Sequence, residues 1–228
     1  PFTTGANGGS IYRGTVRPWK NTIMTAHMVT LPDVADLDVE DAKQVLRSAA
    51  RKNRSRRSTH VREGLVDSWV RTALDFIGDA EVIAAYVSVK DEPPTHELCE
   101  AITAAGKKLL LPKLGPKLSR EWGWYRGPDD LQVMAPGRPP EPGGECLTSK
   151  VLDAVDVLLV PAILVGRHGQ RIGQGGGWYD RILKQVRPDA RIGAMIYPDE
   201  YVEAELPQDP MDVCVHYVIL PDRWGSVS

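Results

Sequence analysis

Apolar residues recur at helical spacing in the first part of the chain. The first set consists of Ala42, Val45, Leu46 and Ala49, and its spacing predicts a helix. Asp38 precedes this set, and its short polar side chain suits the N-cap position of the helix. A second set extends from Val61 to Ile77 and predicts another helix, which Gly78 ends.

Short apolar runs rich in β-branched residues follow, and they are typical of buried strands. We expect strands over residues 81–89, 108–111, 155–160, 192–197 and 217–220. Pro112 is expected to end the second of these strands. Residues 113–150 are rich in Pro, Gly and Trp, so they predict loops with one hairpin near residues 121–125.

Helical patterns separate several of these strands. Residues 95–105, with Thr95 as the expected cap, and residues 149–154 predict helical segments. Strands that alternate with helices and are apolar on both faces predict a mostly parallel sheet that is covered on both sides. The predicted fold class is therefore α/β, in a single domain.

Composition limits the possible partners of this chain. Its 228 residues provide one substantial core, and 42% hydrophobic with 25% charged residues is typical of a soluble globular protein. A net charge of −2 favours neither nucleic acid nor an anionic membrane, and no apolar run approaches a transmembrane span. Three separated cysteines argue against a disulfide framework or a zinc site and suit a reducing cytoplasm. We expect a cytoplasmic monomer.

The N-terminal segment differs from the rest of the chain. Residues 1–27 are rich in Gly, Thr and Asn, lack a regular apolar pattern, and contain no apolar region of the kind found in secretory signals. We interpret residues 1–27 as an expression leader or a disordered extension, and residues 28–228 as the single α/β domain.

A glycine-rich segment, Arg171 to Arg181, is the most distinctive feature of the chain. It contains Gly173, Gly175, Gly176 and Gly177. Glycine lets backbone N–H groups approach an anion closely, and the helical pattern that follows predicts a helix N-terminus, which favours phosphate. We predict a polyphosphate cradle, in which Asp180 can hold a metal ion bound to the same phosphate.

Spacing excludes two familiar phosphate loops. No Gly-x-x-x-x-Gly-Lys run followed by Ser or Thr exists in the sequence, and the dinucleotide fingerprint fails because its third glycine is replaced by Trp178. A simple tight turn is the alternative interpretation of the glycines. The neighbouring Arg171, Tyr179 and Asp180 favour a functional loop.

The stretch from Val157 to Asp180 resembles the 5-formyltetrahydrofolate cyclo-ligase family, also called methenyltetrahydrofolate synthetase. The family pattern is an apolar strand ending in Pro, a Gly-containing loop, and then Arg-Leu-Gly-x-Gly-x-Gly-Tyr-Tyr-Asp. This chain has Val157–Pro161 and then Gly169–Asp180, with Trp178 in place of the first Tyr. The resemblance covers about residues 40–223 and implies a single α/β domain around a parallel or mixed sheet.

The resemblance implies an activity. It is the ATP- and Mg²⁺-dependent cyclisation of 5-formyltetrahydrofolate, which can carry a polyglutamate tail, to 5,10-methenyltetrahydrofolate with release of ADP and phosphate. Transfer of the γ-phosphoryl group to the formyl oxygen gives an imidate phosphate, and ring closure by N10 then expels phosphate. The implied catalytic residues are Arg171, Tyr179 and Asp180.

The same resemblance implies the binding residues. The candidates for ATP are Lys43, Arg47, Gly173, Gln174, Gly175, Gly176, Gly177, Trp178 and Asp180. The candidates for folate are Glu92, Thr95, Trp122 and Tyr179. The candidates for Mg²⁺ are Asp180 and Asp212.

Basic residues cluster between positions 43 and 62. Lys43, Arg47 and Arg51 are each four residues apart, so they share one helix face. A solvated surface is the alternative interpretation, and a nucleic-acid surface is weaker because no aromatic residues are interleaved. The family resemblance implies that Lys43 and Arg47 reach the ATP phosphates, while the remaining arginines are expected at the surface.

The segment Asp91–Thr95 follows a predicted strand end, where the ligand-binding loops of open α/β sheets gather. The family has Glu-x-(Asp/Glu)-Thr here. Glu92 and Thr95 match it, but Pro94 replaces the second carboxylate. A Pro-Pro turn with a helix cap is the alternative. Trp122 belongs to an aromatic cluster that either fills core or forms a wall of the folate pocket.

Two other function classes remain open. A sugar-phosphate isomerase or an acyl-transfer enzyme would also use a glycine loop, but it would not require ATP. A non-catalytic nucleotide- or folate-binding module would bind its ligands without turnover. Retention of Lys43, Arg47, Arg171 and Asp180 favours the enzyme.

Overall fold

The computed structural model describes residues 31–227, and the expected leader at residues 1–27 lies outside this range. The α-helices are α1 (Val39–Arg54), α2 (Thr59–Glu63), α3 (Val66–Ile77), α4 (His96–Ala104) and α5 (Trp178–Leu183). The strands are β1 (Val82–Ala84), β2 (Lys108–Leu114), β3 (Arg120–Trp124), β4 (Leu131–Gln132), β5 (Glu141–Pro142), β6 (Val157–Pro161), β7 (Leu164–Gly166), β8 (Arg171–Ile172), β9 (Arg191–Met195), β10 (Tyr201–Val202), β11 (Tyr217–Ile219) and β12 (Trp224–Ser226). Short 3₁₀ turns are η3 (Pro116–Leu118), η4 (Pro128–Asp130), η5 (Ser149–Ala154) and η6 (Pro198–Glu200).

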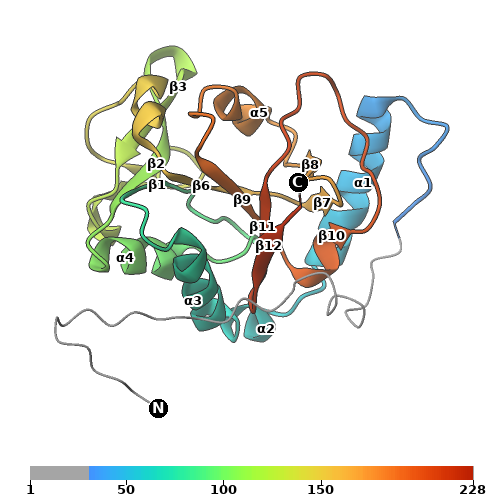
Figure 1. The fold of residues 1–228 in the computed structure, drawn as a ribbon, viewed down its shortest axis with the longest axis horizontal. Coiled ribbons are helices and arrows are strands. Elements are labelled where there is room, and N and C mark those ends of the chain that lie inside the picture. The colour runs from blue at the N-terminus through green and yellow to red at the C-terminus, as the bar shows by residue number, and fades with distance from the viewer. Residues whose placement is uncertain (1–30, 228) are drawn as a thin grey trace.

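A seven-stranded sheet in the order β12-β11-β9-β6-β1-β2-β3 forms the centre of the molecule (Figure 1). The strands from β11 to β2 pair in parallel, whereas β12 and β3 are antiparallel at the two edges. The predicted α/β class with a mostly parallel, mixed sheet is therefore confirmed.

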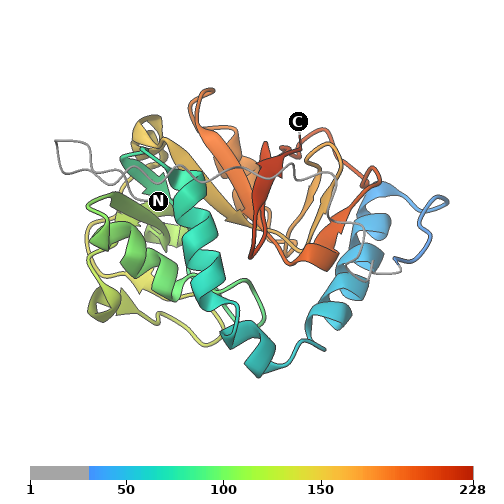
Figure 2. The ribbon, with the colours of Figure 1, turned by 60° about the horizontal axis from the view of Figure 1, so that its bottom comes forward.

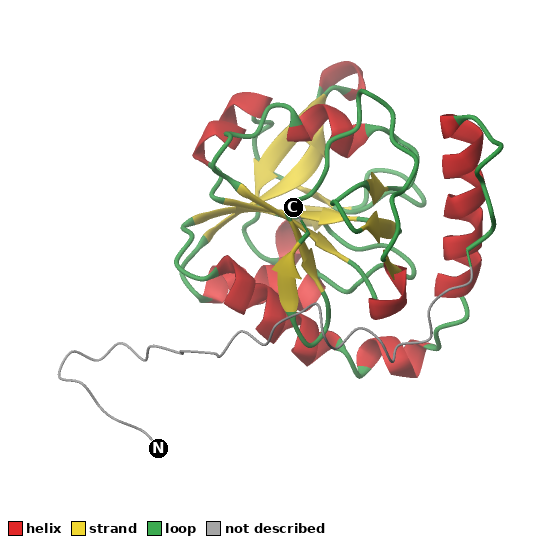
Figure 3. Cartoon of the chain, turned by 45° about the vertical axis from the view of Figure 1, so that its right-hand side comes forward, coloured by secondary structure: helices red, strands yellow, loops and turns green. Residues whose placement is uncertain are grey.

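Alternate residues of the central strands face two different cores. Val157 and Leu159 of β6 pack toward α3 and α4, while Leu158 and Val160 pack toward α5 and η5. All four side chains are fully buried, as expected for a parallel strand between two helical layers. Figure 3 shows helices on both sides of the sheet.

A second, three-stranded sheet in the order β10-β7-β8 supports α1. Leu46 and Ala50 of α1 pack against Leu164, Ile172 and Leu206. In Figure 2 α1 and α3 diverge from their connection at α2, so α1 stands apart from the main helical layer. None of the helices within residues 31–227 is long and apolar enough to cross a membrane.

Several element boundaries differ from those predicted. β1 ends at Ala84. Ala85 N still donates to Leu110 O of β2, but from Tyr86 onward the chain leaves the sheet, and Tyr86 O and Ser88 N bond to the Thr95 hydroxyl before α4. β2 does not end at Pro112 but continues to Leu114. The pairing of β2 with β1 ends at Leu110, and residues 110–114 pair with β3. Proline has no N–H to donate, but at Pro112 this breaks no hydrogen bond to β1. The expected helix from Val61 to Ile77 is divided near Gly64 into α2 and α3.

Candidate active site

The glycine-rich segment joins β8 to α5, and it leads into a helix as predicted. Gly175 has φ of 93° and Gly177, the N-cap of α5, has φ of 59°; both angles lie in the region that glycine adopts without steric cost. A side chain at Gly176 would meet no atom within 4 Å. The loop backbone therefore borders open space beside a helix N-terminus.

The basic face of α1 lies against this loop. Arg47 Nε donates a hydrogen bond to the Gly173 carbonyl at 3.0 Å, and Arg51 Nη2 donates to the Gln174 carbonyl at 2.9 Å. Lys43 forms an ion pair with Asp212. All three side chains contact the loop or the segment before β11, so they share one face as predicted. Lys43 and Arg47 are buried, so a solvated surface is the wrong interpretation for these two, whereas Arg51 is exposed.

Arg171 occupies the centre of the site. Its Nη2 donates to Asp180 Oδ1 at 2.6 Å, and its guanidinium carbon lies 5.8 Å from the centre of the Tyr179 ring. Arg171 Nε is buried without a hydrogen-bond partner among residues 31–227. A buried guanidinium with an unused donor is suited to an additional anionic ligand.

The loop, α1 and the segment before β11 enclose a cavity of 440 Å³. Its lining carries the cations Lys43, Arg47, Arg171, Arg181 and Lys184 and the four loop glycines. This concentration of positive charge beside free backbone is the environment that a polyphosphate requires.

Both of the predicted metal-binding carboxylates, Asp180 and Asp212, line the same cavity. Residues 31–227 contain no group of three or more acidic, His or Cys side chains arranged for a metal. Mg²⁺ usually binds through one or two carboxylates together with substrate phosphates and water. The pair of aspartates fits an ion that is held mainly by a bound phosphate.

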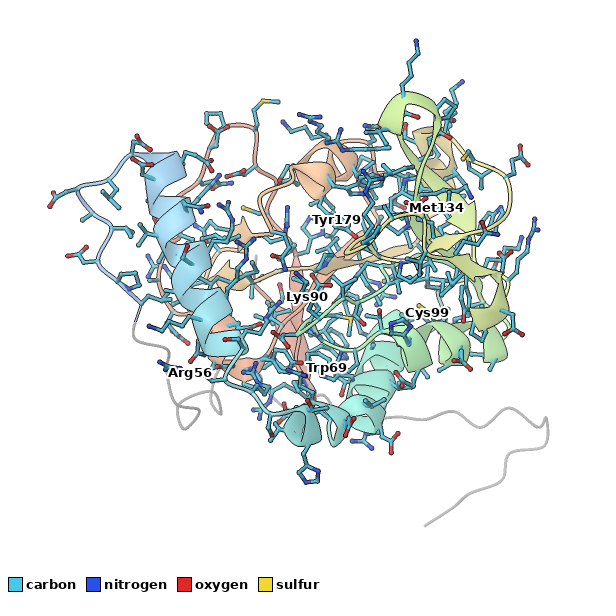
Figure 4. The ribbon with its side chains drawn as sticks, turned by 180° about the vertical axis from the view of Figure 1, so that it is seen from behind. Arg56, Trp69, Lys90, Cys99, Met134 and Tyr179 are labelled. Atoms are coloured by element: carbon cyan, nitrogen blue, oxygen red, sulfur yellow. The ribbon has the colours of Figure 1, made fainter. Side chains whose placement is uncertain are left out.

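A larger cavity of 980 Å³ adjoins the first. Its lining includes Tyr86, Val87, Lys90, Glu92, Pro112, Leu114, Arg138 and Glu141. The two cavities share Pro161, Gln174, Trp178 and Tyr179. Figure 4 shows Tyr179 below α5 and Lys90 beneath it, in the middle of the molecule.

Glu92 projects a carboxylate into the larger cavity. It is 8% exposed, and its oxygens accept hydrogen bonds from Val89 N at 3.1 Å and from Gln174 Nε2 at 3.2 Å. Burial raises the pKa of Glu92 above its ordinary value, although these hydrogen bonds oppose the shift. Burial also raises the pKa of Tyr179, so that phenol stays protonated.

Two predicted folate residues do not line the cavity. Thr95 is fully buried, and its hydroxyl donates to Tyr86 O at 2.7 Å and accepts from Ser88 N at 2.8 Å. Thr95 occupies the N-cap position of α4 as predicted, but its side chain makes no cap hydrogen bond to the helix. Thr95 shapes the loop that presents Glu92.

Trp122 is also fully buried, in the core between the sheet and η5, and it is absent from the cavity lining. The aromatic walls come from Tyr86, Trp178 and Tyr179 instead. The expectation that arginines beyond Arg47 lie at the surface is wrong for Arg54, whose guanidinium is buried against Glu200.

Sequence reasoning missed Tyr86, Lys90 and Arg138 as cavity residues. Lys90 has φ of 52°, which is unusual for a residue with a side chain, and no sequence pattern marks that angle. Arg138 lies in a Gly-Arg-Pro-Pro run, and such a run predicts a loop but no ligand contact. Tyr86 lies inside the strand predicted over residues 81–89 but beyond the observed end of β1 at Ala84. The strand was predicted too long, so Tyr86 was not recognised at a strand end, where ligand sites gather.

Comparisons with known proteins agree with this geometry. The sequence profile described as the 5-formyltetrahydrofolate cyclo-ligase family matches residues 39–221. A protein named 5-formyltetrahydrofolate cyclo-ligase from Mycolicibacterium smegmatis is 34% identical over 192 residues, which cover 80% of this chain and 95% of the relative. The protein of that name from Escherichia coli is 28% identical over 145 residues, or 63% of this chain and 80% of the relative.

The solved structure of Aquifex aeolicus 5,10-methenyltetrahydrofolate synthetase superimposes with a TM-score of 0.68 and 25% identity, covering 81% of this chain and 92% of that one. A synthetase from Mycoplasma pneumoniae has the same fold, with a TM-score of 0.60 and 19% identity over 78% of this chain and 97% of that one. The profile match extends from α1 to the end of β11 and includes every residue that we assign to the two cavities. The chain belongs to the 5-formyltetrahydrofolate cyclo-ligase family.

Proposed function

We propose that this enzyme converts 5-formyltetrahydrofolate to 5,10-methenyltetrahydrofolate in a reaction that consumes ATP and requires Mg²⁺. One observation carries the proposal: a cationic cavity beside a glycine loop adjoins a larger, mainly apolar cavity, and both are bordered by Gln174, Trp178 and Tyr179. Cavities of 440 and 980 Å³ lie in the usual size range for small-molecule and cofactor sites.

The smaller cavity binds the ATP phosphates. Backbone N–H groups of Gly175, Gly176 and Gly177 face the phosphates, while Lys43, Arg47 and Arg171 balance their charge. Asp180 and Asp212 hold Mg²⁺, which neutralises charge on the phosphate oxygens when it is bound. The ion pairs Arg171–Asp180 and Lys43–Asp212 keep both carboxylates at this cavity.

The larger cavity binds the folate. The carboxylate of Glu92 accepts hydrogen bonds from the 2-amino and N3–H groups of the pterin, and Trp178 and Tyr179 contact its ring system. Exposed Lys90 and Arg138 at the same cavity attract the carboxylates of the glutamate tail, whether it has one residue or several.

The chemistry follows from this arrangement. The formyl group on N5 is amide-like, so its oxygen does not leave as hydroxide. Transfer of the γ-phosphoryl group to that oxygen forms an O–P bond and releases ADP. N10 then attacks the activated carbon, loses its proton, and the C–O bond breaks to release phosphate. Arg171 stabilises charge on the transferring phosphoryl group, and the protonated hydroxyl of Tyr179 donates a hydrogen bond at the boundary of the two sites.

We propose that the enzyme acts as a monomer. Cys99, Cys146 and Cys214 are all free thiols. Unpaired cysteines support the proposal that the enzyme acts in a reducing cytoplasm.

Absorbance in the methenyl-folate band tests the proposal. With protein, 5-formyltetrahydrofolate and Mg²⁺, we expect a rise that requires ATP. Binding of both ligands without a rise would instead favour the non-catalytic module, and a protein that binds neither ligand would favour a sugar-phosphate enzyme. An Asp180→Asn variant with full turnover in saturating Mg²⁺ would remove the metal-binding role of Asp180.

Glu92→Gln is expected to weaken folate binding about 10- to 100-fold near neutral pH, because a hydrogen bond to a charged group contributes about 1.5–3 kcal/mol. In the unsubstituted enzyme, acidification through the raised pKa of Glu92 protonates the carboxylate, so folate affinity falls as the pH falls. Glutamine does not titrate, so the variant loses that acid dependence.

Calorimetry of folate binding between acidic and neutral pH measures both effects. Glu97→Gln on the exposed side of α4 is the matched control and is expected to behave like the unsubstituted enzyme. An equal acid dependence in Glu92→Gln and in the control would contradict the assignment of Glu92.

A further inference from the structure

Gln174 connects three segments that are far apart in the sequence. Its Oε1 accepts hydrogen bonds from Arg51 Nη2 at 3.0 Å and from Arg51 Nε at 3.2 Å, and its Nε2 donates to Glu92 Oε1 at 3.2 Å. Arg51 belongs to α1, Glu92 to the loop before α4, and Gln174 to the glycine loop. The side chain therefore lies where the phosphate site and the folate site meet.

The chemistry of its neighbours fixes the orientation of this amide. A guanidinium can only donate hydrogen bonds, so Arg51 requires the oxygen of Gln174. The carboxylate of Glu92 accepts, so it requires the nitrogen. Both ends of the amide are therefore used at once. A flip of the amide would place its nitrogen against the Arg51 guanidinium and its oxygen against the Glu92 carboxylate, and both contacts would be unfavourable.

The backbone of Gln174 belongs to the proposed phosphate cradle. The carbonyl of Gly173 accepts from Arg47, and the carbonyl of Gln174 accepts from Arg51. A Cβ atom on Gly175 would lie 3.3 Å from the guanidinium carbon of Arg47, so the loop packs closely against α1 at this point. A phosphate bound by the loop and by Arg47 restrains the backbone from which the Gln174 side chain extends.

Glu92 depends on this side chain. One of its oxygens accepts from Val89 N within its own loop, and the other accepts from Gln174. The second contact is the one that comes from the nucleotide side of the site. The direction of the Glu92 carboxylate in the larger cavity is therefore linked to the position of the glycine loop.

We propose that Gln174 is a positioning residue that couples the two substrate sites. Nucleotide phosphates fix the glycine loop, Gln174 then fixes the Glu92 carboxylate, and folate binds more tightly when nucleotide is present. This inference rests on the proposed function. Because binding free energies are linked, folate must strengthen nucleotide binding by the same factor.

The test measures the dissociation constant of 5-formyltetrahydrofolate by calorimetry with and without a non-hydrolysable ATP analogue and Mg²⁺. The ratio of the two constants is the coupling factor. We expect about 10-fold for the unsubstituted enzyme, within the usual range for linked sites, and a factor near one for Gln174→Met. Methionine has a similar volume but neither donates to Glu92 nor accepts from Arg51 in the same way.

Two further variants make the result specific. Gln174→Glu keeps an acceptor for Arg51 but cannot donate to Glu92 when ionised, so it is also expected to lose coupling. Gln185→Met makes the same chemical change beyond the C-terminal end of α5, outside both cavity linings, and is expected to keep the full factor. A merely structural role would weaken each ligand alone without changing the ratio.

The outcomes separate this inference from the function on which it rests. ATP-dependent turnover with a coupling factor that disappears in Gln174→Met and Gln174→Glu supports the inference. Turnover with coupling retained in either variant, or with no coupling in the unsubstituted enzyme, overturns the inference and leaves the function intact. Absence of ATP-dependent turnover in the unsubstituted enzyme overturns both.

Discussion

Replacing Arg171 with methionine is expected to lower kcat about a thousandfold while the protein stays folded. Arg171 is buried, is held by Asp180, and lies at the cavity that we assign to the phosphates. A preorganised cation or donor aimed at developing charge contributes about 10²–10³ in rate, and an arginine on a transferring phosphoryl group contributes about 10³–10⁵. Steady-state rates at saturating ATP and folate measure the loss.

Two substitutions accompany this experiment. Arg171→Lys keeps a positive charge without the planar fork of donors, so we expect a kcat between those of the methionine variant and the unsubstituted enzyme. Arg167→Met removes an exposed arginine that pairs with Glu205 outside the cavities, and it is expected to leave kcat unchanged. A kcat for Arg171→Met close to that of Arg167→Met would contradict the catalytic role.

Replacing Arg54 with methionine is expected to lower the free energy of unfolding by about 3–5 kcal/mol. The buried Glu200 carboxylate loses the guanidinium that contacts both of its oxygens and, among residues 31–227, keeps only Arg57 Nη1 at 4.0 Å as a cation. Arg54 is 4% exposed and Glu200 is 1% exposed. The guanidinium contacts both oxygens of Glu200, at 2.7 and 2.5 Å, and also donates to Ala162 O at 2.7 Å. These contacts attach the end of α1 to the residue that follows β6 and to the turn η6.

Urea unfolding measures the change. Arg56→Met removes an exposed arginine two residues away (Figure 4) and is expected to change stability by less than about 0.5 kcal/mol. The double substitution of Arg54 and Glu200 by methionine removes both charges and is expected to recover part of the loss. A loss below about 1 kcal/mol for Arg54→Met alone would show that this pair does not stabilise the position of α1.

The helices, the central strands and the glycine loop were predictable because their signals are local. The Asp38 cap and the loop that leads into α5 are both present in the structure. The strands β7, β8 and β10 have two or three residues each, too few for a repeating pattern to identify them. Their pairing depends on contacts between distant segments, which no local pattern contains.

Predictions about side-chain direction were less accurate than those about location. Trp122 and Thr95 belong to the segments that surround the site, but strand register turns Trp122 into the core, and backbone partners hold Thr95 inside its loop. Arg54 lies three residues beyond Arg51 and therefore near the same side of α1, yet it is buried because Glu200 arrives from a segment 146 positions away. Sequence spacing indicates which helix face a residue occupies but not what that face meets.

Oxygen isotope transfer tests the central claim, that the γ-phosphoryl group of ATP passes to the formyl oxygen where the two cavities meet. The substrate is 5-formyltetrahydrofolate with ¹⁸O in the formyl group, and mass spectrometry measures the isotope in the released phosphate. The account predicts one ¹⁸O atom in each phosphate released during ring closure. Unlabelled phosphate, with ¹⁸O released as water, would contradict it.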